Sequence, residues 1–158
     1  MEVSSTKIHV MVLQQRIIIN AALEDVFAFF SQPGNLARIT PPSLGFRIIA
    51  APDRGLRQGD RITYRIRVAG LPVRWVTLIT DWVPNVSFTD TQEKGPYKTW
   101  IHFHRFTKVA DGVLMEDRVD YELPFGRLGE KFGGWFVRAQ LRRIFDYRTE
   151  VIRSIFET

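Results

Sequence analysis

Two of the three histidines in this sequence, His102 and His104, alternate with large aromatic residues in the segment WIHFHRF, residues 100–106. Alternate side chains of a β-strand lie on the same face, so Trp100, His102, His104 and Phe106 would lie together. Imidazole is a metal ligand, a general acid or base, and a hydrogen-bonding group. The chemistry therefore depends on which face of the strand carries the histidines and on what lies opposite them.

A hairpin turn predicts that the histidines point inward. The pair Asp111-Gly112 is typical of a two-residue turn, and with this register His104 lies opposite Val119 and diagonally across from Asp117. The other face of the hairpin carries mostly charged residues: Arg105, Thr107, Glu116, Arg118, Asp120 and Glu122. We assign that charged face to solvent, which leaves the histidine face for the interior.

Further turns extend the inward face over the neighbouring strands. A turn at Ala69-Gly70 places Tyr64 opposite Trp75, and a turn at Pro84-Asn85 sets the next pairing. The second turn predicts these opposed residues: Asp81 with Phe88, Ile79 with Asp90, and Thr77 with Gln92. A three-residue loop over residues 93–95, with Gly95 left-handed, keeps Asp90 and Gln92 on the same face as the histidines.

The predicted inward face is mostly aromatic with polar groups among the rings. Its members are Tyr64, Trp75, Thr77, Ile79, Asp90, Gln92, Trp100, His102, His104, Asp117 and Tyr121. A core that served stability alone would avoid so many buried polar side chains, because each needs a hydrogen-bond partner. An apolar surface with a few convergent polar groups is typical of a ligand pocket.

The elements that position this face follow from periodicity and turn residues. We predict strands at residues 7–19, 44–51, 60–68, 71–83, 86–93, 96–109 and 113–123. A helix is predicted at 22–31, with Glu24 and Asp25 in its first turn, and the segment NLARIT predicts another short helix. Apolar residues at three- and four-residue steps predict a long helix over 128–157.

Composition limits the classes of protein. The chain has 158 residues, 45% of them hydrophobic and 25% charged, which is typical of one globular domain spanning residues 1–158. It contains no cysteine, which excludes disulfides, thiolate metal sites and a cysteine nucleophile. We find no signal peptide and no apolar run long enough for a membrane span, so we expect a cytoplasmic protein.

The net charge of +5 raises the question of a nucleic-acid or anionic-lipid partner. The arginines are scattered, however, and no run of five like charges occurs. Two groups of them are expected on solvated faces: Arg61, Arg65, Arg67 and Arg74, and Arg138, Arg142, Arg143, Arg148 and Arg153. We therefore expect no nucleic-acid partner, and either a monomer or a homodimer.

Five segments of the chain carry a resemblance to a known family. They are VFAFFSQPGNLARITPP, GDRITYRI, WVTLITDWVPNVSFTDTQEKGPYKTWIHFHRF, MEDRVDYELPFG and FDYRTEVIRSIF. The order of elements and these segments resemble the START/Bet v 1-like (SRPBCC) superfamily, in its bacterial polyketide cyclase/dehydrase-like, ligand-binding branch. The resemblance implies an α+β helix-grip fold, in which a seven-stranded antiparallel sheet, with two short helices after strand 1, wraps around a long C-terminal helix. It also implies a cavity between sheet and helix.

Three interpretations of the histidine pair remain open. His102 and His104 could share a metal with Asp117, with Asp90 farther away; they could form a hydrogen-bonded pocket wall; or His104 and Asp117 could be a catalytic acid/base pair. We predict no bound metal and no cofactor. The ligand-contacting residues that we predict are Tyr64, Trp75, Thr77, Asp90, Gln92, Trp100, His102, Tyr121, Phe132 and Phe136, the last two forming an aromatic mouth beside helix glycines.

The sequence thus predicts a protein that binds a hydrophobic or aromatic small molecule, or a lipid, in an internal cavity. The alternative is a cyclase or dehydratase that uses the same cavity, with His104 and Asp117 as acid and base. A third class, a module that binds another macromolecule outside the cavity, would show salt-sensitive binding.

Overall fold

Seven antiparallel strands form one sheet in the computed structural model, which describes residues 10–157. They are β1 (Met11–Ile19), β2 (Arg47–Ala50), β3 (Arg61–Val68), β4 (Leu71–Val83), β5 (Ser87–Lys94), β6 (Thr99–Val109) and β7 (Gly112–Glu122). The order across the sheet is β1-β7-β6-β5-β4-β3-β2, so β2 to β7 follow one another as hairpins. Residues 7–9 of the predicted first strand lie outside the described residues.

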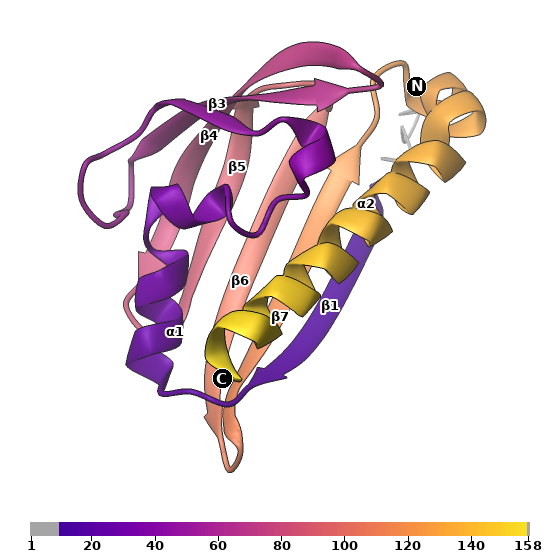
Figure 1. Cartoon of the computed structure of the whole chain (residues 1–158). Helices are drawn as coiled ribbons and strands as arrows, with labels where there is room; N and C mark the ends of the chain where they lie inside the picture. Colours follow the sequence, from indigo (N-terminus) through magenta and orange to yellow (C-terminus); the bar gives the residue numbers. More distant parts are fainter. Residues whose placement is uncertain (1–9, 158) are drawn as a thin grey trace, which may run out of the picture.

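The helices cover the inner face of this sheet. They are α1 (Leu23–Phe30), the 3₁₀ turns η1 (Pro33–Leu36) and η2 (Pro42–Leu44), and the long α2 (Gly126–Phe156), which crosses the sheet diagonally (Figure 1). The predicted α+β helix-grip fold is therefore confirmed. Within residues 10–157 no helix is both long enough and apolar enough to cross a membrane.

The segment NLARIT is not the short helix that we predicted. Its first two residues, Asn35 and Leu36, end the 3₁₀ turn η1, and the 3₁₀ turn η2 follows it; each turn has proline at its first position, Pro33 and Pro42. Proline fits the first turn of a helix, but residues that precede a proline are driven out of the helical region. The prolines at 41 and 42 therefore end this segment before a regular helix can form.

The β6–β7 turn is shifted by one residue from the predicted one. Val109 pairs with Gly112, so Ala110 and Asp111 form the turn. Gly112 has φ +126°, and a side chain there would collide with the carbonyl of Ile19 at the end of β1. Contact with a third strand therefore sets this register.

The shift moves each partner by two positions, so both faces of the hairpin keep their residues. Asp117 now lies directly opposite His104, and Val119 lies opposite His102. The predicted pairing of His104 with Val119 was wrong. The assignment of the charged series to the outer face was right, because that assignment depends only on alternation.

The β4–β5 pairing contains a bulge at Thr80 that the sequence did not reveal. The predicted pairings of Ile79 with Asp90 and of Thr77 with Gln92 are confirmed, whereas Phe88 lies opposite Trp82 and not Asp81. Because a bulge inserts one residue, the side chains of β4 that follow it lie on the opposite face from the one that simple alternation predicts. Trp82 consequently points inward and stacks on Phe88, with ring centroids 5.2 Å apart.

The connection between β5 and β6 is longer than the three residues predicted. The ladder ends where Thr91 pairs with Ile101, and Gly95 is not left-handed. The side chain of Gln92 shapes this loop, since its amide donates to the Tyr97 carbonyl at 2.8 Å and its oxygen accepts from the Tyr97 N–H at 3.2 Å. The Tyr64–Trp75 pairing between β3 and β4 is confirmed.

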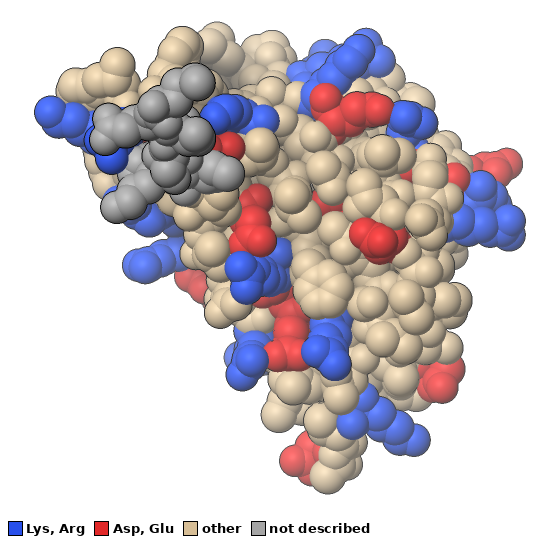
Figure 2. All heavy atoms as spheres, turned by 180° about the vertical axis from the view of Figure 1, so that it is seen from behind, with Lys and Arg blue, Asp and Glu red and all other residues tan. Residues whose placement is uncertain are grey.

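The outer face of the sheet carries mixed charge. Seen from behind, lysines and arginines are interspersed with carboxylates (Figure 2). Arg16 pairs with Glu116 at 2.9 Å and Arg118 with Asp120 at 3.0 Å. Such exposed pairs contribute little stability, and their mixed signs agree with a solvated surface.

Candidate functional site

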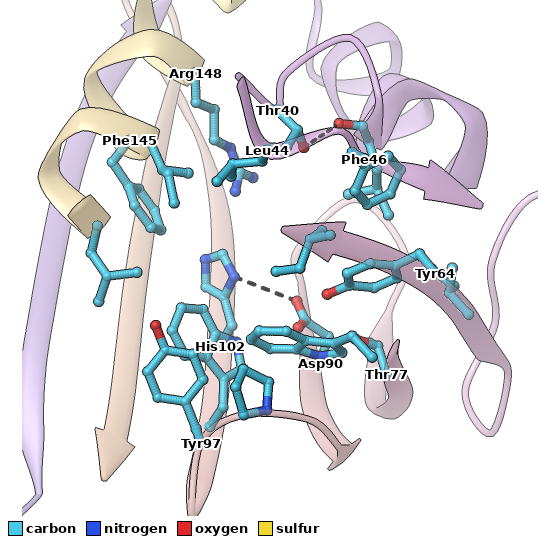
Figure 3. Close-up of a pocket in the computed structure, with 18 of the residues that line it drawn as sticks. Thr40, Leu44, Phe46, Tyr64, Thr77, Asp90, Tyr97, His102, Phe145 and Arg148 are labelled. Carbon is cyan, nitrogen blue, oxygen red and sulfur yellow. Dashed lines mark hydrogen bonds and ion pairs between the residues drawn. The ribbon is translucent and has the colours of Figure 1, made fainter. Parts of the chain in front are cut away.

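A pocket of about 340 Å³ lies between the sheet, α2 and the segment that leads from η1 into β2. Its walls are mainly aromatic and aliphatic, and Phe46, Tyr64, Tyr97 and Phe145 line it (Figure 3) together with Trp75 and Trp100. Several of these rings also pack on one another. The centroids of Tyr64 and Trp75 lie 5.8 Å apart, and those of Trp75 and Trp100 5.4 Å apart.

One polar cluster interrupts this apolar surface. It consists of Asp90 on β5, His102 and His104 on β6, Asp117 on β7 and Arg148 on α2, and we call it the polar cluster. Strand alternation brings the first four to the inner face, and the helix supplies the fifth from above. All but Asp90 are buried, and the side chain of Asp90 is 18% exposed.

The contacts within the polar cluster are short. Nε2 of His104 lies 2.7 Å from Oδ2 of Asp90, and Nε2 of His102 lies 3.1 Å from Oδ1 of Asp117. Nδ1 of His104 lies 2.8 Å from the same Asp117 oxygen, although without the alignment of a hydrogen bond. The imidazole centroids are 3.7 Å apart, so each carboxylate faces both histidines.

The two carboxylates are held in their ionised form. Burial alone would raise the pKa of Asp117, but Arg148 and the two histidines outweigh burial and keep this pKa well below its ordinary value. Burial likewise opposes ionisation of Asp90, yet the nearby histidines and Arg148 lower its pKa. Both groups therefore act as acceptors at neutral pH.

The surroundings shift the pKa values of the two imidazoles in opposite directions. Burial and the neighbouring His104 lower the pKa of His102, despite the two carboxylates beside it. Burial also acts against the charged form of His104, but Asp117 and Asp90 outweigh it and raise the pKa of His104. Paired groups with pKa values moved apart are typical of acid/base sites.

Three members of the polar cluster also form a candidate set of metal ligands. One ligand atom each from Asp90, His102 and His104 lies within 4.8 Å of the others, and imidazole with carboxylate is a donor set that zinc accepts. However, Nε2 of His104 and Oδ2 of Asp90 are already at direct hydrogen-bond distance, and the guanidinium of Arg148 adds positive charge beside the cluster. This geometry suits a hydrogen-bonded network better, and the absence of a metal stays a prediction.

The structure brings most of the predicted site residues to the pocket. Its lining includes Tyr64, Trp75, Thr77, Asp90, Trp100, His102, His104 and Phe136. Asp117 lies behind the histidines and does not line the pocket, and Tyr121 is buried beside Tyr97 and Trp100. The Gln92 amide is bound to the loop backbone, and Phe132 is 73% exposed and does not line the pocket.

Arg148 is the lining residue that sequence analysis misplaced. We expected it on a solvated face, but it is 8% exposed and lines the pocket. A signal was present, because Leu141, Phe145, Arg148 and Ile152 follow the four-, three- and four-residue steps of one helical face. Phe46, Tyr97 and Phe145 were also missed as lining residues, since none lies on the predicted sheet face.

Comparisons with known proteins agree with this fold. A family model described as polyketide cyclase / dehydrase and lipid transport matches residues 11–153, and the chain belongs to that family. The chain is thus a member of the SRPBCC superfamily that the sequence segments resembled. No curated protein sequence matches it significantly.

Solved structures extend the likeness at low identity. The ZhuI aromatase/cyclase from Streptomyces sp. R1128 is 15% identical with a TM-score of 0.74, over 94% of each chain. Ginseng major latex-like protein 151 from Panax ginseng is 14% identical with a TM-score of 0.67, over 93% of this chain and 97% of that one. Identities this low establish the fold alone.

Proposed function

We propose that this protein binds a hydrophobic or aromatic small molecule in the pocket between the sheet and α2. The observation that carries the proposal is an aromatic pocket of about 340 Å³ whose buried polar groups are gathered mainly in one cluster. That volume is in the lower part of the range for small-molecule sites, and mostly apolar walls with few polar groups are their usual composition. Burial of ligand rings would supply most of the affinity, and the polar cluster would fix the orientation.

A neutral fluorescent probe tests the proposal. We expect 1-aminoanthracene, which brightens in apolar surroundings, to bind saturably with one site per chain. The variant Ile144→Trp fills part of the pocket from α2, and its affinity should fall at least ~10-fold, because a ligand that must displace a packed ring loses contact area. Fluorescence titration measures both constants.

A matched control separates the pocket from the surface. Ile101 lies on the outer face of β6 and is 45% exposed, so Ile101→Trp adds the same ring without touching the pocket and should leave the affinity unchanged. Lack of saturable binding by a well-folded protein, or equal loss in both variants, would contradict binding in this pocket.

Acid/base catalysis is the second candidate function. The specific observation in its favour is the pair of pocket-lining imidazoles, whose surroundings raise the pKa of His104 and lower the pKa of His102, with Asp90 bonded to His104 at 2.7 Å. Such a pair can donate one proton and accept another, as a cyclisation or dehydration requires. ZhuI, a similar structure, is named an aromatase/cyclase, which supports this candidate as an analogy of fold only.

Mass spectrometry distinguishes the two candidates. The ligand released from protein purified from its own organism would be identified and returned to fresh protein. A binding protein should release that ligand unchanged, whereas an enzyme should convert either it or its precursor.

A further inference from the structure

Arg148 presents a buried positive charge to the pocket. Its side chain is 10% exposed, and it points from α2 into the pocket above His102 (Figure 3). The guanidinium carbon lies 5.3 Å from the ring centroid of Phe30 and 5.6 Å from that of Phe145. These cation–π contacts hold the guanidinium in place, but the rings do not replace hydrogen-bond acceptors for its N–H groups.

The hydrogen-bonding capacity of this guanidinium is not used. Among the described residues it makes no hydrogen bond; Nε is buried without a partner, and the closest carboxylate oxygen, Oδ1 of Asp117, lies 3.9 Å from Nη2. The same oxygen is already hydrogen-bonded to Nε2 of His102 at 3.1 Å and lies 2.8 Å from Nδ1 of His104. Arginine remains protonated in proteins and carries five donors, so burial without an acceptor is costly.

We propose that Arg148 is a recognition site for a carboxylate group on the hydrophobic ligand. This inference rests on the proposed function and names its chemical class, an aromatic or aliphatic acid whose apolar body fills the pocket. A carboxylate matches the planar fork of a guanidinium and accepts two parallel hydrogen bonds from it. A neutral amide of the same shape has only one oxygen to offer.

The charges around Arg148 allow an added anion. Asp117 on β7 and Asp90 on β5 face it, but each lies within hydrogen-bond distance of a histidine on β6. The pocket tyrosines Tyr64 and Tyr97 stay neutral, because burial raises their pKa values. Burial lowers the pKa of His102 and so favours its neutral form, whereas a ligand carboxylate beside it would favour uptake of a proton that balances the new charge.

Two isosteric probes test the inference. We expect 2-naphthoate to bind at least ~10-fold more tightly than 2-naphthamide at pH 7, since they differ in charge and not in shape. In Arg148→Gln the naphthoate affinity should fall at least ~10-fold while the naphthamide affinity stays within ~3-fold. Arg143→Gln, at an exposed position of the same helix, should change neither affinity.

The outcomes separate the inference from the proposed function. Equal affinity of the wild-type protein for both probes, or tighter binding of the amide, would overturn the carboxylate site while leaving the pocket proposal intact. An equal loss of affinity for both probes in Arg148→Gln would show that Arg148 has a packing role, and it would also overturn the carboxylate site. Failure of the wild-type protein to bind either probe would overturn both proposals. Should Arg148→Gln fail to fold, Arg148→Met replaces the guanidinium with an uncharged chain of similar length and should abolish the preference for naphthoate. A preference retained in Arg148→Met would overturn the inference.

Discussion

Replacement of Asp117 by asparagine should lower the free energy of unfolding at pH 7 by about 3 kcal/mol, as for a buried ion pair that loses one partner. The side chain of Asp117 is 5% exposed and lies within 4 Å of His102, His104 and Arg148. Asparagine has almost the same shape but no charge, so the change leaves the buried guanidinium of Arg148 facing a neutral amide. Urea denaturation monitored by circular dichroism measures the difference.

The pH dependence of the free energy of unfolding should show that the charge of Asp117 is the cause. Because the folded pKa of Asp117 lies well below its ordinary value of 3.8, its contribution is fully present above that ordinary value. The contribution is lost as the pH falls through the folded pKa. The deficit of Asp117→Asn should therefore shrink in acid, and a deficit of equal size at pH 7 and in strong acid would contradict the ionic explanation.

A neighbouring aspartate on the other face of β7 provides the control. Asp120 pairs with Arg118 at 3.0 Å on the outer face, where its side chain is 33% exposed. Asp120→Asn removes the same charge from the same strand, and it should cost less than about 0.5 kcal/mol. Similar losses in the two variants would show that burial of the polar cluster is not responsible.

If the protein is an enzyme, His104→Gln should reduce turnover by about 10²- to 10⁴-fold, the usual contribution of a general acid or base. His104 lines the pocket, and Asp90 and Asp117 favour its protonated form, which suits it to donate a proton to a bound oxygen. Glutamine retains a hydrogen-bonding side chain but cannot donate a proton and regain it. Turnover of the naturally bound ligand, followed by mass spectrometry, measures the loss.

The affinity of His104→Gln for that ligand separates chemistry from binding. It should change only a few-fold, because the apolar walls supply most of the contact. Phe103→Gln, at the adjacent outer-face position of β6, where the side chain is 37% exposed, should retain full turnover. Unchanged turnover in His104→Gln would remove this histidine from the acid/base role.

The inward orientation of the histidines was predictable from the sequence because it depends on a local property. Along β6 and β7, charged and apolar residues alternate, and a change of register by two positions leaves that alternation intact. The order of elements, the long final helix and the pairing of Tyr64 with Trp75 could also be predicted, since helical spacing and turn residues are local signals.

Only the tertiary structure decided which groups meet. Asp117 lies opposite His104 because Gly112 packs against the end of β1, a contact between residues far apart in the sequence. The bulge at Thr80, which turns Trp82 inward, has no comparable local signal. Helical spacing assigns Arg148 to the buried face of α2, but only the docking of α2 on the sheet brings it to Asp117. Local periodicity determines the face on which a residue lies, whereas its partner across the pocket depends on how the helix and strands pack.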